Sequence, residues 1–210
     1  MVTRQPTRRT NMLNYTLLFQ IKSDWFIGSG KEAGAYADAL CLKNNSGLPY
    51  IPGKSCKGLL KDAFKLAAHN NWFEPQLVKL LFGEEGEHGN HSQGLLQISS
   101  AGLSDAESQF IIDKQASKHL FRVLQSTAID SKTGSAKTLS LRSVEVAIPM
   151  DLRASLSLNI NHPNYSQANS QFNLDTHFQT YLQQVLTLIH EFGGKRHRGF
   201  GQVTVSIEGA

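Results

Sequence analysis

Alternation of apolar and polar residues marks five segments of the chain as β-strands. In the first, at about 15–22, Leu17, Phe19 and Ile21 fall on one face and the residues between them on the other. Because successive side chains of a strand point to opposite faces of a sheet, this spacing predicts a strand with one buried face. The same pattern predicts further strands at about 94–99, 143–148, 153–160 and 202–207.

Apolar residues spaced three and four positions apart predict helices between these strands. Three helices are expected, at about 55–69, 74–82 and 175–192. Ser55 is placed to act as the N-cap of the first helix. Gly193 and Gly194 follow the last one, where glycine commonly ends a helix.

The remaining segments are polar or irregular. Residues 1–13 are expected to form a flexible basic arm, and 161–172 a polar loop. Residues 107–141 show no clean period and contain a turn signal at 130–134, so they are interpreted as an extended excursion with a hairpin. In the strand that follows, Glu145 alternates with Val144 and Val146, which places it on the opposite face.

The predicted order is β-α-(α)-β-β-β-α-β, with a long insertion before the middle strands. This order is close to a ferredoxin-like arrangement, in which helices back one antiparallel sheet. The fold class is therefore expected to be α+β, in a single domain over 14–210. Such a fold hosts many functions, including RNA binding, so function has to be argued from particular residues.

Composition narrows the range of functions. The 210 residues carry a net charge of +4 and only two cysteines, Cys41 and Cys56, so a reducing cytoplasmic location is expected rather than a disulfide framework. No apolar run reaches the roughly 20 residues of a membrane span, and no membrane partner is expected. The basic residues gather around 4–9, 114–142 and 195–198, away from the acids near 84–87. Clustered cations of this kind favour phosphate binding, although a solvated surface would look similar.

The basic glycine segment, residues 193–201, reads GGKRHRGFG. Glycine allows a backbone to approach a phosphate closely, and the cations favour a polyanion there. The alternative is a helix C-cap whose basic residues face the helix dipole. We expect five residues of the segment to contact RNA: Lys195, Arg196, His197, Arg198 and Gly199.

A second candidate anion site lies at the start of the first predicted helix. The triplet formed by Gly53, Lys54 and Ser55 is not a P-loop, because Leu48 stands where that motif needs its first glycine. A helix N-terminus nevertheless favours anions, and Lys54, Ser55 and Lys57 would strengthen the site. The alternative is an ordinary helix start.

These segments occur in the order found in the RAMP superfamily of CRISPR-associated proteins, which the chain resembles over about 14–208. The resemblance is carried by FIGSG (26–30), LPYIPGKSCKG (48–58), LFG (81–83), GLLQIS (94–99) and GGKRHRGFG (193–201). It is strongest to the repeated backbone subunit of type III effector complexes, the Cas seven family of the Csm and Cmr systems.

The resemblance implies an RRM-like palm with an inserted thumb hairpin, here at about 115–142. Such subunits stack along CRISPR guide RNA, and their thumbs wedge into the duplex of guide and complementary target RNA. Partners would then be both RNAs, other copies of the chain and other effector subunits. The resemblance extends RNA binding to four further residues: Gly28, Gly30, Lys132 and Lys137.

The resemblance also implies a catalytic residue. Asp38 matches an aspartate that cleaves target RNA in several such subunits, with Mg²⁺ or Mn²⁺ as the implied cofactor. Ala39 and Leu40 depart from the family pattern, which has a proline nearby. The alternative role for Asp38 is to cap a turn.

Three further alternatives stay open. The chain could be a non-catalytic structural or capping subunit of the same complex. A repeat-RNA-processing endoribonuclease is disfavoured, because the first predicted helix has no histidine before His69. His88 and His91 could bind zinc together with Glu87, but a solvated polar loop is favoured because no cysteine is near.

Overall fold

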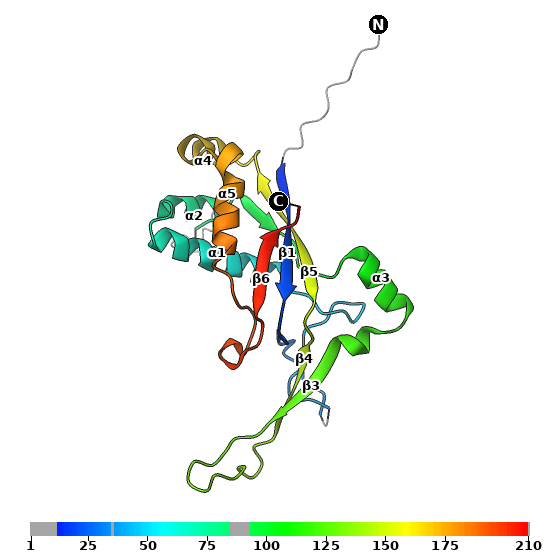
Figure 1. Ribbon diagram of the computed structural model, residues 1–210. Helices are drawn as coiled ribbons and strands as arrows, with labels where there is room; N and C mark the ends of the chain where they lie inside the picture. Colours follow the sequence, from blue (N-terminus) through cyan, green and yellow to red (C-terminus); the bar gives the residue numbers. More distant parts are fainter. Residues whose placement is uncertain (1–11, 35, 85–92, 210) are drawn as a thin grey trace.

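The computed structural model describes residues 12–34, 36–84 and 93–209. Its main sheet contains four strands in the order β2-β5-β1-β6, each antiparallel to its neighbours. Figure 1 shows this sheet between a group of helices on one side and a long hairpin that extends away from it. The strands are β1 (Met12–Ile21), β2 (Leu96–Ile98), β5 (Asp151–Asn159) and β6 (Val203–Ile207).

The predicted alternation determines which face of this sheet is covered. Leu17, Phe19 and Ile21 of β1 are buried, and Leu17 lies opposite Ala154 of β5 and Ile207 of β6. The intervening positions of β1 and β5 are more exposed. A shift of one residue in either pairing would move the apolar set to the open face, so this burial defines the register.

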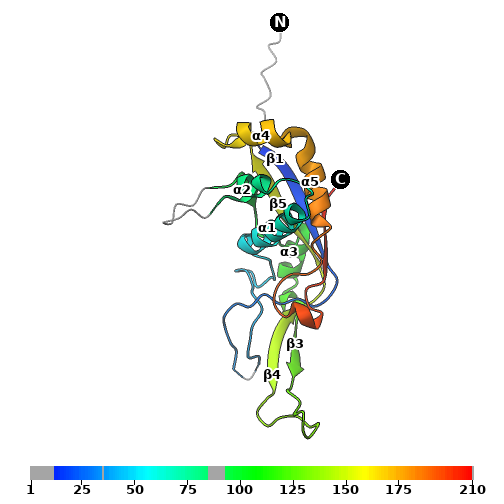
Figure 2. The ribbon, with the colours of Figure 1, turned by 90° about the vertical axis from the view of Figure 1, so that its left-hand side faces the viewer.

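Four helices pack against the covered face, as the second view in Figure 2 shows from their side. They are α1 (Gly53–His69), α2 (Pro75–Phe82), α4 (Tyr165–Phe172) and α5 (Leu174–Leu186). Phe64 of α1 and Phe178 of α5 are fully buried and contribute to one hydrophobic core. The sheet order and the positions of α1 and α5 are those of a ferredoxin-like βαββαβ unit, which confirms the expected α+β class.

The hairpin is inserted between β2 and β5. It is preceded by α3 (Asp105–Asp113) and the 3₁₀ turn η2 (Ser117–Leu120). Its two strands, β3 (Phe121–Ser126) and β4 (Arg142–Ala147), pair antiparallel in a separate sheet. We call the hairpin 121–147 the thumb and the remainder the palm. The excursion expected at 107–141 thus contains most of α3, η2 and most of the thumb.

Several local predictions were wrong. Residues 161–172 were expected to form a loop, but α4 forms because Tyr165, Ala168 and Phe172 give it a buried stripe with helical spacing. The N-cap of α1 is Pro52, so Ser55 lies within the first turn. β1 begins at Met12, two residues inside the expected arm, whose residues 1–11 lie outside the described part of the chain.

The last helix ends six residues earlier than expected. The amides of Leu188 and Ile189 bond the carbonyls three residues before them, which tightens the chain after α5. The amide of Phe192 then bonds Gly201, so the segment joins the start of β6 instead of continuing the helix. Gly193 therefore does not cap α5.

Within the described residues, none of the helices has both the length and the apolar character needed to cross a membrane.

Candidate nucleic-acid interface

Three of the predicted RNA-binding segments meet in one groove beside the N-terminus of α1. The groove has a volume of about 380 Å³. Gly28 contributes one wall, Ser55 the start of α1, and Gly193, Gly194 and Arg196 the other wall. These residues are up to 168 positions apart in the sequence, so the fold alone brings them together.

Backbone contacts hold the basic glycine segment against residues 26–28. The amide of Gly194 donates to the carbonyl of Phe26 at 2.7 Å. Gly193 has φ +77°, and a Cβ atom there would lie 2.6 Å from the same carbonyl oxygen. Gly193 is therefore required by this close packing, which neither the predicted cap nor phosphate contact explains.

The cations of this segment face two different hollows. Arg196 begins the 3₁₀ turn η3 (Arg196–Arg198) and lines the groove. Arg198 and Gly199 line a neighbouring hollow of about 330 Å³, together with Lys22 of the palm and Arg122 of the thumb. Lys195 and His197 are not among the lining residues of either. Arg122 forms an ion pair with Asp24, so one cation of the second hollow is already partly neutralised.

At the start of α1, Lys54 and Ser55 are exposed and Lys57 is half-buried. The N-terminus of a helix favours anions, but the amide of Gly53 already donates to the hydroxyl of Ser100 at 3.1 Å, and of these three residues only Ser55 lines the groove. Burial lowers the pKa of Lys57, and the neighbouring charge of Lys61 lowers it further. Lys54 and Lys57 do not line the groove, so their contacts with RNA stay predictions.

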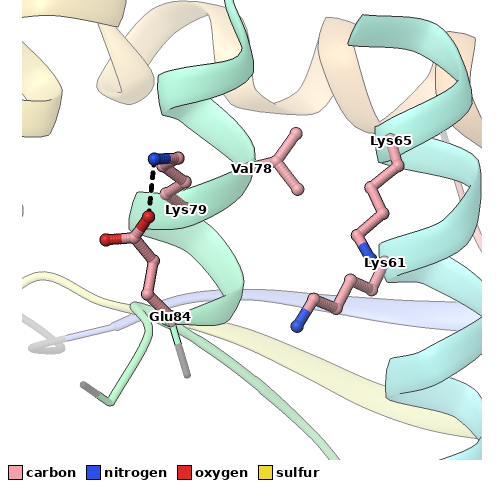
Figure 3. A pocket seen from close by; sticks show the side chains of 6 residues that line it. Lys61, Lys65, Val78, Lys79 and Glu84 are labelled. Atoms are coloured by element: carbon pink, nitrogen blue, oxygen red, sulfur yellow. Dashed lines mark ion pairs between the residues drawn. The ribbon is translucent and has the colours of Figure 1, made fainter. Parts of the chain in front are cut away.

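A third hollow, also basic, lies on the other side of α1, facing α2 (Figure 3). Lys61 and Lys65 extend from α1 and Lys79 from α2, around a volume of about 300 Å³. Lys79 is paired with Glu84 at 2.6 Å. The predicted site residues do not line this hollow, which leaves its cations as surface charge between two packed helices.

A short antiparallel pairing between two segments of the chain connects Asp38 to the groove. Residues 27–31 run antiparallel to 40–42, with the amide of Ser29 donating to Leu40 and that of Leu42 to Ile27, at 3.0 and 2.7 Å. A bridge joins Gly28 to Cys41. One side of this pair therefore contributes Gly28 to the groove, and the other leads back to Asp38.

The carboxylate of Asp38 is exposed and oriented by the first residues of β4. Its Oδ2 accepts hydrogen bonds from the amide and the hydroxyl of Ser143, at 2.6 and 3.3 Å. The amide of Asp38 donates to the carbonyl of Ser143 at 2.9 Å. Within the described residues no donor contacts Oδ1, so one oxygen faces outward and could accept a proton or contact a cation.

The expected divalent cofactor has few protein ligands available. No group of three histidine, cysteine, aspartate or glutamate residues in the described ranges could hold a metal ion. Asp38 offers one free carboxylate oxygen, so Mg²⁺ or Mn²⁺ fits here only if RNA phosphates and water complete its shell. His88 and His91, considered above for zinc, lie outside the described residues.

Two predicted RNA-binding residues lie away from the groove, near the end of the thumb. Lys132 and Lys137 are exposed on a loop closed by Asp130, whose carboxylate accepts the amide of Lys132 at 2.8 Å. A bridge between Ile129 and Ala136 closes the same loop. Gly30, in turn, has open space around it and φ +73°, and does not line the groove.

Sequence reasoning missed residues that act through contacts distant in the chain. Ser143, which bonds Asp38, has no sequence signal beyond its alternating strand position. Alternation predicts a polar face for Glu145, yet this residue is 2% exposed, because residues 38–40 pair with β4 and cover it. An acid between two valines in a strand was the one available signal. Lys22 and Arg122 had no distinguishing pattern.

Comparisons with known proteins agree with this architecture. The family model for the RAMP superfamily matches residues 18–204. None of the curated proteins matches the sequence. Two solved structures, titled "Type III-B Cmr-beta Cryo-EM structure of the Apo state" and "Cryo-EM structure of the Type III-B Cmr-beta bound to cognate target RNA", contain chains with the same fold. Both have a TM-score of 0.64, at 12% and 11% identity, over 93% of this chain and 97% of the other. With the family model covering most of its length, this chain belongs to the RAMP superfamily.

Proposed function

We propose that the chain is an RNA-binding backbone subunit of a type III CRISPR effector complex, which stacks on guide RNA and cleaves complementary target RNA at Asp38. The groove carries the proposal, because it joins Gly28, the start of α1 and Arg196 on one surface. Membership of the RAMP superfamily and the fold shared with chains of Cmr complexes support it.

Guide binding would use backbone and charge rather than base identity. The groove offers a serine at the start of α1 and an arginine, both of which suit phosphate oxygens. Asp62 also lines the groove and opposes an anion there, so Arg196, together with Arg198 in the neighbouring hollow, would have to outweigh it. We therefore expect affinity to depend strongly on salt and weakly on guide sequence.

Replacing Arg196 and Arg198 with alanine tests this part. We expect the affinity for guide RNA to fall about tenfold, and the slope of log K against log salt to decrease by about 1.4, or 0.7 for each phosphate that is no longer neutralised. The matched control is Lys65→Ala with Lys79→Ala, which removes two exposed charges from the hollow between α1 and α2, where none of the predicted site residues lies. Equal reductions in affinity in both double variants would argue against a localised guide site.

Cleavage would proceed by attack of a target ribose 2′-OH on the adjacent phosphate. Oδ1 of Asp38 accepts the 2′ proton, the 2′ oxygen bonds to phosphorus, and the bond to the 5′ oxygen breaks. The leaving 5′ oxygen takes a proton from water. The products are a 2′,3′-cyclic phosphate and a 5′-OH end. A divalent ion held at the reacting phosphate by RNA oxygens and water would supply charge neutralisation there and leave Oδ1 of Asp38 to act as the base.

Asp38→Asn tests the catalytic role and keeps an acceptor for the amide of Ser143. In the assembled complex we expect target cleavage to fall by at least about 100-fold, the scale of general base catalysis, with guide binding unchanged. Asp105→Asn, which alters an exposed acid of α3, should cleave normally. Cleavage at the wild-type rate by the Asp38 variant would rule out this residue as the base.

A second function is favoured by one observation, namely that Oδ2 of Asp38 already holds the amide of Ser143. In a non-catalytic structural or capping subunit, Asp38 would serve only to attach its loop to the thumb. The wild-type complex would then leave target RNA intact with and without Mg²⁺ or Mn²⁺, while guide binding still depended on Arg196 and Arg198.

A further inference from the structure

Glu145 is the only charged side chain buried in the described part of the chain, at 2% exposure. Its carboxylate receives three donors from the loop that contains Asp38. Nζ of Lys43 lies 2.9 Å from Oε1, the Tyr36 hydroxyl 3.3 Å from the same oxygen, and the amide of Cys41 3.2 Å from Oε2. One acid of β4 therefore contacts three residues of the segment 36–43.

These contacts offset the cost of burying the charge. A buried carboxylate is strongly unfavourable unless a cation and hydrogen bonds compensate it. Lys43 supplies the cation and also lies 4.1 Å from the ring centre of Phe121 in β3, a distance that favours a cation–π interaction. Removing Lys43 would leave the buried carboxylate of Glu145 without its cation at the base of the thumb, whereas Lys43, at 35% exposure, would keep contact with solvent if Glu145 were removed.

Backbone bonds on both sides of Glu145 connect this ion pair to Asp38. The amide of Glu145 donates to the carbonyl of Ala39 at 2.9 Å, and the amide of Asp38 donates to the carbonyl of Ser143. A parallel bridge joins Ala39 to Val144. Asp38 and Glu145 therefore lie on neighbouring, hydrogen-bonded stretches of chain, within two residues of the same bridge.

We propose that the Lys43–Glu145 ion pair is a positioning device that anchors residues 36–43 on β4 and so sets the place of the Asp38 carboxylate. Neither residue contacts RNA in this proposal, and both act through the loop. The anchoring stands on the contacts above, whereas its effect on cleavage rests on the function proposed for Asp38. Two measurements separate these parts.

Hydrogen exchange tests the anchoring in the free chain. In Lys43→Met and Glu145→Gln, we expect the amides of Asp38 and Cys41 to exchange at least about tenfold faster than in wild type, as local opening becomes easier. The amide of Phe19, in the β1 ladder, should keep its protection. Lys43→Arg should behave as wild type, because it keeps the charge. Lys114→Met is the matched control, since it removes a lysine charge outside the network.

Cleavage by the assembled complex tests the positioning. We expect Glu145→Gln to lower the rate at saturating target about 10-fold to 100-fold, the range that misplacement of a reacting group by about 1 Å can produce. The dissociation constants for guide and target should stay unchanged, and Lys43→Arg should cleave within about threefold of wild type. The double variant Lys43→Met with Glu145→Gln leaves no unpaired buried charge. It therefore serves as a control for misfolding caused by an unpaired buried charge.

Each outcome tests either the anchoring of residues 36–43 or the positioning of the Asp38 carboxylate. Unchanged exchange of the Asp38 and Cys41 amides in both single variants would overturn the anchoring. Faster exchange with wild-type cleavage, while Asp38→Asn is inactive, would overturn the positioning. If Asp38→Asn cleaves normally, the proposed function fails at that residue, and exchange alone still decides whether the ion pair anchors the loop.

Discussion

The palm and the thumb are both built from antiparallel strands, but they are stabilised differently. In the palm, the inward residues of β1 and β5 pack under four helices in one hydrophobic core. In the thumb, burial stops at Val144: none of residues 125–143 is buried, and Leu139 is 94% exposed. Beyond the paired residues Ser126 and Arg142, the thumb is held by local hydrogen bonds alone.

The difference indicates what each region depends on. The palm can hold its shape from its own burial, whereas the far half of the thumb has no core to define one. Ile129, Leu139 and Leu141 remain exposed there, which is expected of a surface that contacts something else. The thumb is instead fixed at its base, where Trp25 pairs with Ala147 and the Lys43–Glu145 ion pair lies.

The largest effect is expected from removing palm core. Phe178→Ala should lower the free energy of unfolding by about 3–5 kcal/mol, because the fully buried ring also contacts Tyr15. Leu139→Ala in the thumb should stay within about 0.5 kcal/mol of wild type. Urea denaturation followed by circular dichroism measures both. Similar destabilisation of the two variants would mean that the thumb contributes to the core.

Two glycines sharpen the comparison. Gly201 in the palm has φ +70°, and an added Cβ atom would overlap the carbonyl oxygen of Phe192. Gly134 in the thumb has φ +68° but open space around it. Gly134→Ala should therefore cost only the left-handed strain of about 1–2 kcal/mol. Gly201→Ala should cost about 3 kcal/mol in total, because the backbone must also move. Equal costs in urea denaturation would refute the packing argument.

Deleting the far half of the thumb should have a smaller effect still. If an Asn-Gly turn replaces residues 127–141, the remaining strands can close as a short hairpin. We expect the free energy of unfolding to change by no more than about 1 kcal/mol, because no buried side chain is removed and the shorter loop offsets the missing hydrogen bonds. Destabilisation by several kcal/mol would show that the thumb is not independent of the palm.

The same comparison explains how far the sequence could predict the structure. The palm strands and α1 were predictable because their apolar spacing reports burial directly, and their order indicated a ferredoxin-like sheet. The end of α5 was not predictable. The chain leaves the helix because Phe192 bonds Gly201, and both of these residues lie beyond the helix. α4 was missed because its stripe of Tyr165, Ala168 and Phe172 is short and set in polar residues.

The candidate site divides in the same way. Glycines and cations of the groove could be selected by residue type, since phosphate binding needs those types. Their meeting at one groove, and the separation of Arg198 and Gly199 into another hollow, depend on the fold. Contacts made across about 100 residues, such as Ser143 to Asp38 and Lys43 to Glu145, leave no local pattern in the sequence.

The reactivity of cysteine thiols compares the palm and the thumb by a property other than stability. Burial raises the pKa of Cys41, and it raises that of Cys56 to about 11. At pH 8 the thiolate fraction of Cys56 is then about one in a thousand, whereas an exposed cysteine introduced as Ser131→Cys in the thumb would be about a quarter thiolate. Iodoacetamide should label the thumb cysteine at least about 100-fold faster. Rapid labelling of both native cysteines at pH 8 would instead mean that the palm opens readily, and the contrast between a self-sufficient palm and a dependent thumb would fail.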